Sequence, residues 1–80
     1  MNDVTMYTTS VCPFCIAAKQ LLKSKKIEYR EIELGADPHH RQRLMEENGG
    51  WRTVPMIFIN DKFIGGFTEL RTLSSNGGLA

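Results

Sequence analysis

The most informative segment of this chain is residues 4–15, Val-Thr-Met-Tyr-Thr-Thr-Ser-Val-Cys-Pro-Phe-Cys. Residues 4–8 have the β-branched and aromatic side chains of a short strand, and a helical pattern follows Pro13. A helix beginning at Pro13 places Cys12 at its N-cap, where free backbone N–H groups and the helix dipole stabilise a thiolate. Cys15 lies one turn further on, close enough to attack a mixed disulfide formed at Cys12. The spacing predicts a nucleophilic Cys12 and a resolving Cys15.

Two other uses of a Cys-x-x-Cys pair fit this chain poorly. A closed zinc site needs about four ligands, and the remaining candidates, His39 and His40, are adjacent residues whose side chains diverge on a helix. A disulfide between the only two cysteines would close a very short loop and would constrain the unfolded chain little. We therefore favour redox chemistry and expect no metal, with a silent structural pair as the remaining alternative.

The composition indicates one small domain over residues 1–80. Ten basic and nine acidic side chains give a formal charge of +1, and no basic run with interleaved aromatics occurs, so nucleic-acid binding is not expected. No apolar run approaches the roughly 20 residues that span a bilayer, and residues 1–3 lack the features of a signal peptide. We expect a monomer in the cytoplasm, away from membranes, where a Cys-x-x-Cys pair cycles.

The first half of the chain reads as a strand, a helix and a second strand. The helix after Pro13 has apolar residues at the spacing of a stripe that packs on a sheet, at Phe14, Ala17, Ala18, Leu21 and Leu22. Residues 29–34 alternate loosely and suit a polar edge strand. This strand is expected to pair in parallel with residues 4–8 through a right-handed crossover.

The second half begins with another helix. Asp37 and Pro38 form an N-cap followed by a first-turn proline, and the helix is expected to end near Asn48. His39 and His40 fall in its first turn, where we expect them to be exposed.

A hairpin and a final helix complete the chain. Residues 56–59 are all apolar, which is typical of a strand buried on both faces. Asn60-Asp61 can form a tight turn into an antiparallel strand over residues 62–64. Gly65-Gly66 ends that strand, and Thr68 is expected to cap the final helix. The order is βαβ followed by ββα.

Three motifs in this order give the chain a resemblance to a known family. It resembles glutaredoxins of the small bacterial dithiol type, with Cys12-Pro13-Phe14-Cys15 after the first strand, Thr53-Val54-Pro55 before the third and Gly65-Gly66 before the last helix. The resemblance spans nearly the whole chain. It implies an α/β protein with a thioredoxin-like fold, a four-stranded mixed sheet flanked by three helices, and glutathione as co-substrate.

The resemblance also implies a glutathione site. Val54 would pair its backbone with the cysteinyl part of glutathione in the manner of an added strand, beside Pro55 in the cis form. Residues 66–68 would face the γ-glutamyl carboxylate at the start of the last helix. Gln42 would approach the glycyl carboxylate, and Phe14 would flank the tripeptide. The implied contact residues are Phe14, Gln42, Thr53, Val54, Pro55, Gly66, Phe67 and Thr68.

The chain departs from the usual pattern of that family at three positions. Phe14 stands where the family usually has tyrosine, and Thr9 where it usually has lysine. Thr68 stands where many members have aspartate, with the nearest acid at Glu69. These changes bear on glutathione affinity more than on the fold. Arg52, just before the Thr-Val-Pro motif, is a candidate replacement for the missing cation.

The sequence thus predicts a glutathione-dependent thiol-disulfide oxidoreductase that reduces protein disulfides and glutathione mixed disulfides. Its expected partners are glutathione and disulfide-bonded or glutathionylated proteins, with ribonucleotide reductase as a candidate. Two alternatives stay open. One is a redoxin that serves ribonucleotide reductase and is reduced by thioredoxin reductase. The Thr-Val-Pro motif at residues 53–55 argues against this alternative. The other is an iron-sulfur carrier in which Cys12 of two chains and two glutathiones hold a cluster, against which Pro13 counts.

Overall fold

A computed structural model of the protein describes residues 3–10, 12–35 and 37–77. In chain order the elements are β1 (Val4–Thr8), α1 (Pro13–Ser24), β2 (Tyr29–Glu33), α2 (Pro38–Glu47), β3 (Met56–Ile59), β4 (Lys62–Gly65) and α3 (Phe67–Ser75). The strands form one sheet in the order β2-β1-β3-β4. β1 pairs with β2 in parallel and with β3 antiparallel, and β3 pairs antiparallel with β4. The predicted mixed sheet and three helices are confirmed.

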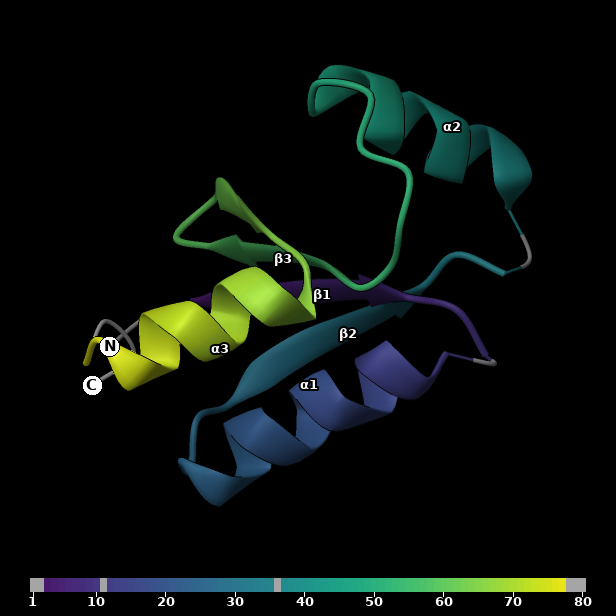
Figure 1. Ribbon diagram of the computed structural model, residues 1–80. Coiled ribbons are helices and arrows are strands. Elements are labelled where there is room, and N and C mark those ends of the chain that lie inside the picture. Colours follow the sequence, from purple (N-terminus) through teal and green to yellow (C-terminus); the bar gives the residue numbers. More distant parts are fainter. Residues whose placement is uncertain (1–2, 11, 36, 78–80) are drawn as a thin grey trace.

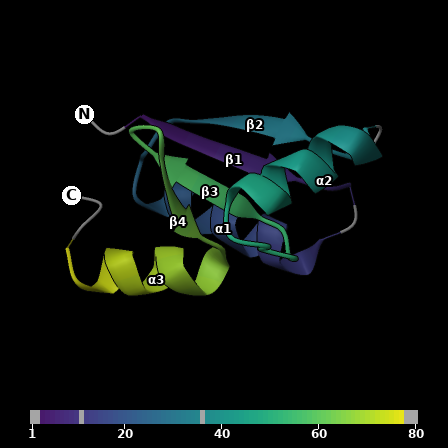
Figure 2. The same ribbon diagram turned by 90° about the horizontal axis from the view of Figure 1, so that it is seen from above.

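The helices cover the two faces of the sheet unequally. α1 and α3 lie on one face, and α2 lies on the other (Figure 1). In the view from above, α2 lies in front of the sheet and α1 behind it (Figure 2). Among the residues described, no helix is long and apolar enough to cross a membrane.

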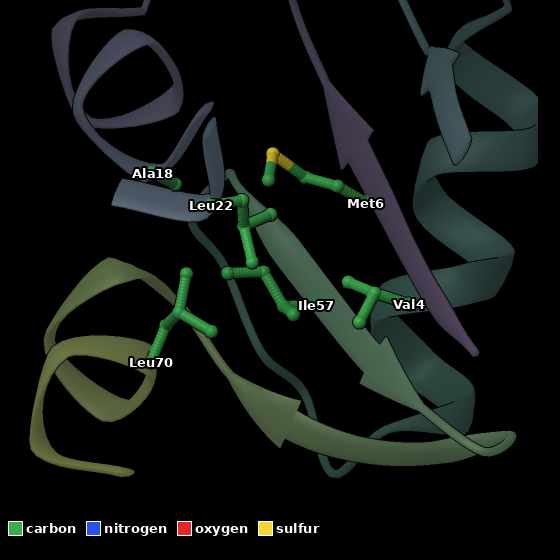
Figure 3. Close-up of a cluster of buried hydrophobic side chains, with 6 residues drawn as sticks. All are labelled: Val4, Met6, Ala18, Leu22, Ile57 and Leu70. Atoms are coloured by element: carbon green, nitrogen blue, oxygen red, sulfur yellow. The ribbon is translucent and has the colours of Figure 1, made fainter. Parts of the chain in front are cut away.

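The main core lies between the sheet and the helix pair α1 and α3 (Figure 3). Alternate residues of β1 point into it, as the period of a strand requires. Burying one large aliphatic side chain stabilises a fold by about 1.5–3 kcal/mol. The fully buried members of this core are Val4, Met6, Ala18, Leu22, Ile57 and Leu70.

α1 begins where the sequence predicts, at Pro13 with Cys12 as N-cap, and Ala18 and Leu22 of the predicted stripe are buried. Its buried residues are Cys15, Ala18 and Leu22, at the i, i+3 and i+7 positions of one stripe. A helix turns by about 100° per residue, so Phe14 lies well to one side of this stripe. The expectation that Phe14 belongs to the packing stripe is wrong, because its side chain is 63% exposed.

The second face of the sheet carries a smaller core under α2. It is built around Leu34, Leu44 and Met56. The side chain of Asp37 caps α2 by accepting the backbone N–H of His40 at 3.0 Å, as predicted. His40 is half-buried rather than exposed, because its ring meets the ring of Tyr7 edge-on at 5.9 Å.

The remaining strand predictions hold with small shifts. β2 lies at the sheet edge and its residues are mostly exposed, as its polar pattern indicates. β3 lies between two strands, with Met56 and Ile57 fully buried. Asn60 and Asp61 take left-handed backbone conformations, with φ of 53° and 66°, in the turn before β4. The predicted tight hairpin is confirmed.

The start of α3 differs from the prediction. Gly66, not Thr68, is the N-cap, and the helix begins at Phe67. The carboxylate of Glu69 reaches back and accepts the backbone N–H of Gly66 at 2.8 Å. This bond satisfies a donor at the helix start, so no hydroxyl cap is needed at Thr68.

Candidate active site

The two cysteines occupy different environments at the start of α1. The Cys12 sulfur accepts the backbone N–H of Cys15 at 3.1 Å, so the cysteine side chain itself caps the helix. The Cys12 thiol also lies 3.6 Å from the carbonyl oxygen of Val54, to which it donates. Cys12 is 8% exposed, whereas Cys15 is 1% exposed and faces the core. An incoming disulfide therefore meets Cys12 first.

Burial raises the pKa of the Cys15 thiol to about 12. The hydrogen bond with Cys12 contributes to this rise in the pKa, while the backbone of Thr9 and the charge of Lys19 act in the opposite direction. Cys15 is thus a protonated thiol at neutral pH. This asymmetry favours the predicted roles of Cys12 as nucleophile and Cys15 as resolving thiol, and those roles stay predictions.

A hollow of about 250 Å³ opens beside the cysteine pair. It lies between the loop before β3 and the start of α3, and the Val54–Pro55 peptide bond in its wall is cis, as the resemblance implies. Every implied contact residue except Gln42 lines it. The full lining is Phe14, Trp51, Thr53, Val54, Pro55, Gly66, Phe67, Thr68 and Glu69.

Aromatic side chains form the walls of this hollow. The rings of Phe14 and Phe67 lie 6.4 Å apart, and the guanidinium of Arg71 lies 5.9 Å from the centre of the Phe67 ring. Trp51, which packs edge-on against Phe63 at 5.2 Å, forms another part of the wall. Sequence reasoning missed Trp51, although a lone tryptophan two residues before the Thr-Val-Pro motif was a usable signal.

Gly66 keeps the hollow open. A Cβ atom at this position would lie 3.3 Å from the carbonyl oxygen of Pro55 and 3.6 Å from the Trp51 ring. Backbone N–H groups in the first turn of a helix have no acceptor within the helix, and Phe67 and Thr68 occupy that turn of α3. The hollow is therefore bounded by potential donors for an anionic group.

Gln42 lies outside this hollow, on α2, where its amide donates to the Glu46 carboxylate at 3.2 Å. It lines a neighbouring hollow of about 400 Å³ that also includes Arg41 and Arg52. The structure thus places the predicted glutamine and the candidate replacement cation together. Neither Gln42 nor Arg52 lines the hollow formed by Phe14, Val54 and the start of α3.

No grouping of three or more histidine, cysteine or acidic side chains that could hold a metal ion occurs within residues 3–10, 12–35 and 37–77. The chemistry that the site offers is that of two thiols, backbone donors and an aromatic-walled hollow.

Comparison with known proteins assigns this arrangement to a family. A family model for glutaredoxin matches residues 4–64. The glutaredoxin of Neisseria meningitidis is 42% identical over 80 residues, covering 99% of this chain and 93% of that protein. Glutaredoxin 1 from Francisella tularensis, crystallised with cacodylate, matches with a TM-score of 0.83 and 33% identity over the whole of both chains. A buckwheat glutaredoxin-glutathione complex matches with a TM-score of 0.83 and 28% identity, covering 95% and 71% of the two chains.

The chain belongs to the glutaredoxin family and has its thioredoxin-like fold. It is accordingly a thiol-disulfide oxidoreductase. The sequence predictions of family, fold class and reaction type are confirmed.

Proposed function

We propose that this glutaredoxin takes its electrons from glutathione and reduces both glutathione mixed disulfides and protein disulfides. The observation that carries the proposal is a hollow that combines backbone donors with aromatic walls and is lined by Val54, whose carbonyl oxygen lies 3.6 Å from the Cys12 sulfur. A related buckwheat glutaredoxin forms a complex with glutathione. The hollow and this relative together favour glutathione over another reductant.

Glutathione would lie across the hollow in an extended form. The Val54 backbone would pair with the cysteinyl residue, as an added strand pairs with a sheet edge. The γ-glutamyl carboxylate would accept hydrogen bonds from the first N–H groups of α3, at Phe67 and Thr68. Phe14, exposed at the rim, would cover the tripeptide from the side of α1.

The glycyl carboxylate would point toward the neighbouring hollow. Arg52 borders that hollow together with Gln42, and we assign to Arg52 the charge that the family usually supplies by a lysine at the position of Thr9. Arg52 is exposed, so its attraction for a carboxylate would be modest and sensitive to salt.

The reaction begins at Cys12. Its thiolate attacks one sulfur of the substrate disulfide, a new S–S bond forms, and the substrate leaves as a thiolate that takes up a proton. A glutathione thiolate can then attack the glutathionyl sulfur on Cys12, which returns the Cys12 thiolate and releases glutathione disulfide. Alternatively Cys15 attacks Cys12, and two further glutathiones reduce the Cys12–Cys15 disulfide.

The partners and location follow from the same proposal. Glutathionylated and disulfide-bonded proteins would be the substrates, and ribonucleotide reductase is one candidate among them. We place the protein in the cytoplasm as a monomer, where the glutathione pool keeps the cysteine pair reduced.

The reductant is tested by supplying either glutathione with glutathione reductase, or thioredoxin reductase alone, and measuring turnover of a disulfide substrate. Glutathione with glutathione reductase should sustain turnover. Turnover sustained only by thioredoxin reductase would contradict the proposal and support the redoxin alternative.

A further inference from the structure

A charged cluster spans α1 and β2 close to the resolving thiol. The ammonium group of Lys19, on α1, pairs with the carboxylate of Glu31, on β2. The hydroxyl of Thr8, at the end of β1 and fully buried, donates to the same carboxylate at 2.8 Å. The Lys19 and Glu31 side chains are only 29% and 33% exposed, so the pair is partly shielded from water.

Lys19 stands one helical turn after Cys15. Residues four apart on a helix lie on the same face, so the lysine and the buried thiol are neighbours. The positive charge of Lys19 lowers the pKa of Cys15, against the much larger effect of burial. The Glu31 hydrogen bond raises the pKa of Lys19, so the ammonium group keeps its proton at neutral pH. Three further titratable groups act on this set, namely Cys12, Tyr29 and Lys23.

We propose that Lys19, held in place by Glu31 and Thr8, is a positioning residue for the resolving step, where its charge stabilises the negative charge that develops on the Cys15 sulfur. This inference rests on the proposed function, which makes Cys15 the resolving thiol. A thiol buried to 1% exposure loses the water that would stabilise its ionised form, and the charge of Lys19 adds to the backbone of Thr9 in offsetting that loss.

The step is balanced without proton transfer from Lys19. The Cys15 thiol releases its proton to water, and its sulfur bonds to the Cys12 sulfur. The bond between Cys12 and the substrate sulfur breaks, and the substrate leaves as a thiolate that accepts a proton from water. The two cysteines become oxidised as the substrate sulfur is reduced. Lys19 supplies only a fixed positive charge, so it acts on this route and not on the route that bypasses Cys15.

The size of the effect follows from thiol chemistry. Raising the pKa of Cys15 by one unit leaves about tenfold less thiolate, but it increases the nucleophilicity of each thiolate by about threefold. The net loss is about threefold in rate for each unit. Replacing the lysine by a neutral residue should therefore slow closure of the Cys12–Cys15 disulfide measurably without abolishing it.

The test is a rapid acid-quench measurement with glutathione disulfide as the oxidant of the reduced enzyme. At high oxidant concentration, formation of the Cys12–glutathione mixed disulfide is fast, and the rate plateau reports closure by Cys15. We compare Lys19→Gln with Lys19→Arg, which keeps the charge, and with Lys23→Gln, which removes a charge one turn further along α1. The closure rate in Lys19→Gln should fall, by about threefold for each unit by which the pKa of Cys15 rises, and the other two variants should stay near wild type.

Three results would overturn the inference: an unchanged plateau in Lys19→Gln, an equal loss in Lys19→Arg, or an equal loss in Lys23→Gln. A slowing of deglutathionylation when Lys19→Gln is placed in a Cys15→Ser background would also overturn it, because no resolving step remains there. Failure of the wild-type protein to form any Cys12–glutathione mixed disulfide would instead contradict the proposed function. The two failures are thus distinguishable.

Discussion

The backbone N–H of Cys15 donates to the sulfur of Cys12 at 3.1 Å, so the reactive side chain and the helix cap are the same group. A thiolate is a stronger acceptor than a thiol, because hydrogen bonds to ionised groups are about twice as strong as neutral ones. The bond therefore holds the Cys12 sulfur in place while that sulfur acts as the attacking thiolate. Cys15 thus orients Cys12 through its backbone before its own thiol takes part.

The absence of a side chain at Gly66 should be essential for glutathione use. In Gly66→Ala the new Cβ would lie 3.3 Å from the Pro55 carbonyl oxygen and would intrude between the walls of the hollow. We expect the KM for glutathione to rise by about tenfold or more, since one methyl group in a binding pocket is worth about 1–3 kcal/mol. Gly35→Ala, whose Cβ would make only an ordinary contact at 3.5 Å, is the matched control. Equal KM values in the two variants would argue against glutathione binding here.

Arg52 should attract the glycyl carboxylate. Arg52→Gln is expected to raise the KM for glutathione by about 1.4- to fivefold at low salt, the effect of an exposed ion pair of about 0.2–1 kcal/mol. The difference should shrink in high salt because the charges are screened. Arg43→Gln removes the same charge from an α2 residue that does not line the hollow, and it should leave KM unchanged. A loss that is equal in both variants would reflect overall charge instead of a specific contact.

Stability should depend on the buried stripe of α1 and little on its exposed side. Leu22→Ala should lower the free energy of unfolding by about 2–5 kcal/mol, because Leu22 is fully buried in the main core. Ile16→Ala, at a side chain 54% exposed on the same helix, should change it by less than about 0.5 kcal/mol. Urea unfolding measures both. Comparable losses would mean that α1 packs through a different face.

The Lys19–Glu31 pair should make stability depend on pH in the acid range. The hydrogen bond with Lys19 lowers the pKa of Glu31 below its ordinary value of 4.5. A carboxyl group whose pKa is lower in the folded than in the unfolded state stabilises the fold above the unfolded pKa, and this contribution is lost as pH falls through the folded pKa. The free energy of unfolding of the wild type should therefore exceed that of Glu31→Gln by about 0.5–1 kcal/mol at pH 7. The gap should close below pH 4.5, and a gap independent of pH would rule out the ion pair as its source.

Local signals in the sequence were sufficient for most of the fold. Pro13 after Cys12, and Pro38 after Asp37, mark helix starts that the structure shows at the same residues. The polar pattern of residues 29–33 correctly indicated an edge strand. These features depend on short-range backbone chemistry, which a single sequence displays directly.

The sequence predictions were wrong where tertiary contacts, or a hydrogen bond from a side chain, determine which residue is buried or caps a helix. Phe14 fits a helical stripe by spacing, but the stripe that faces the sheet is set by Cys15 one position later. Thr68 is a good capping residue, but the helix starts earlier, and the Glu69 carboxylate accepts the backbone N–H of the actual N-cap, Gly66. Trp51 lines the hollow because the loop before β3 carries it there, and the path of a loop cannot be predicted from hydrophobic periodicity. The motifs indicated where the candidate site lies, while the lining of the hollow depended on tertiary packing.

The central claim is that Cys12 is the nucleophile and Cys15 the resolving thiol. Its most direct test measures Cys12→Ser and Cys15→Ser in two assays, deglutathionylation and reduction of a protein disulfide. Cys12→Ser should lose both activities, because Cys12 forms the first bond in either route. Cys15→Ser should keep deglutathionylation, since glutathione can itself resolve a glutathionylated Cys12, and should lose much of its protein disulfide reduction. Deglutathionylation that persists in Cys12→Ser and is absent in Cys15→Ser would contradict the assignment.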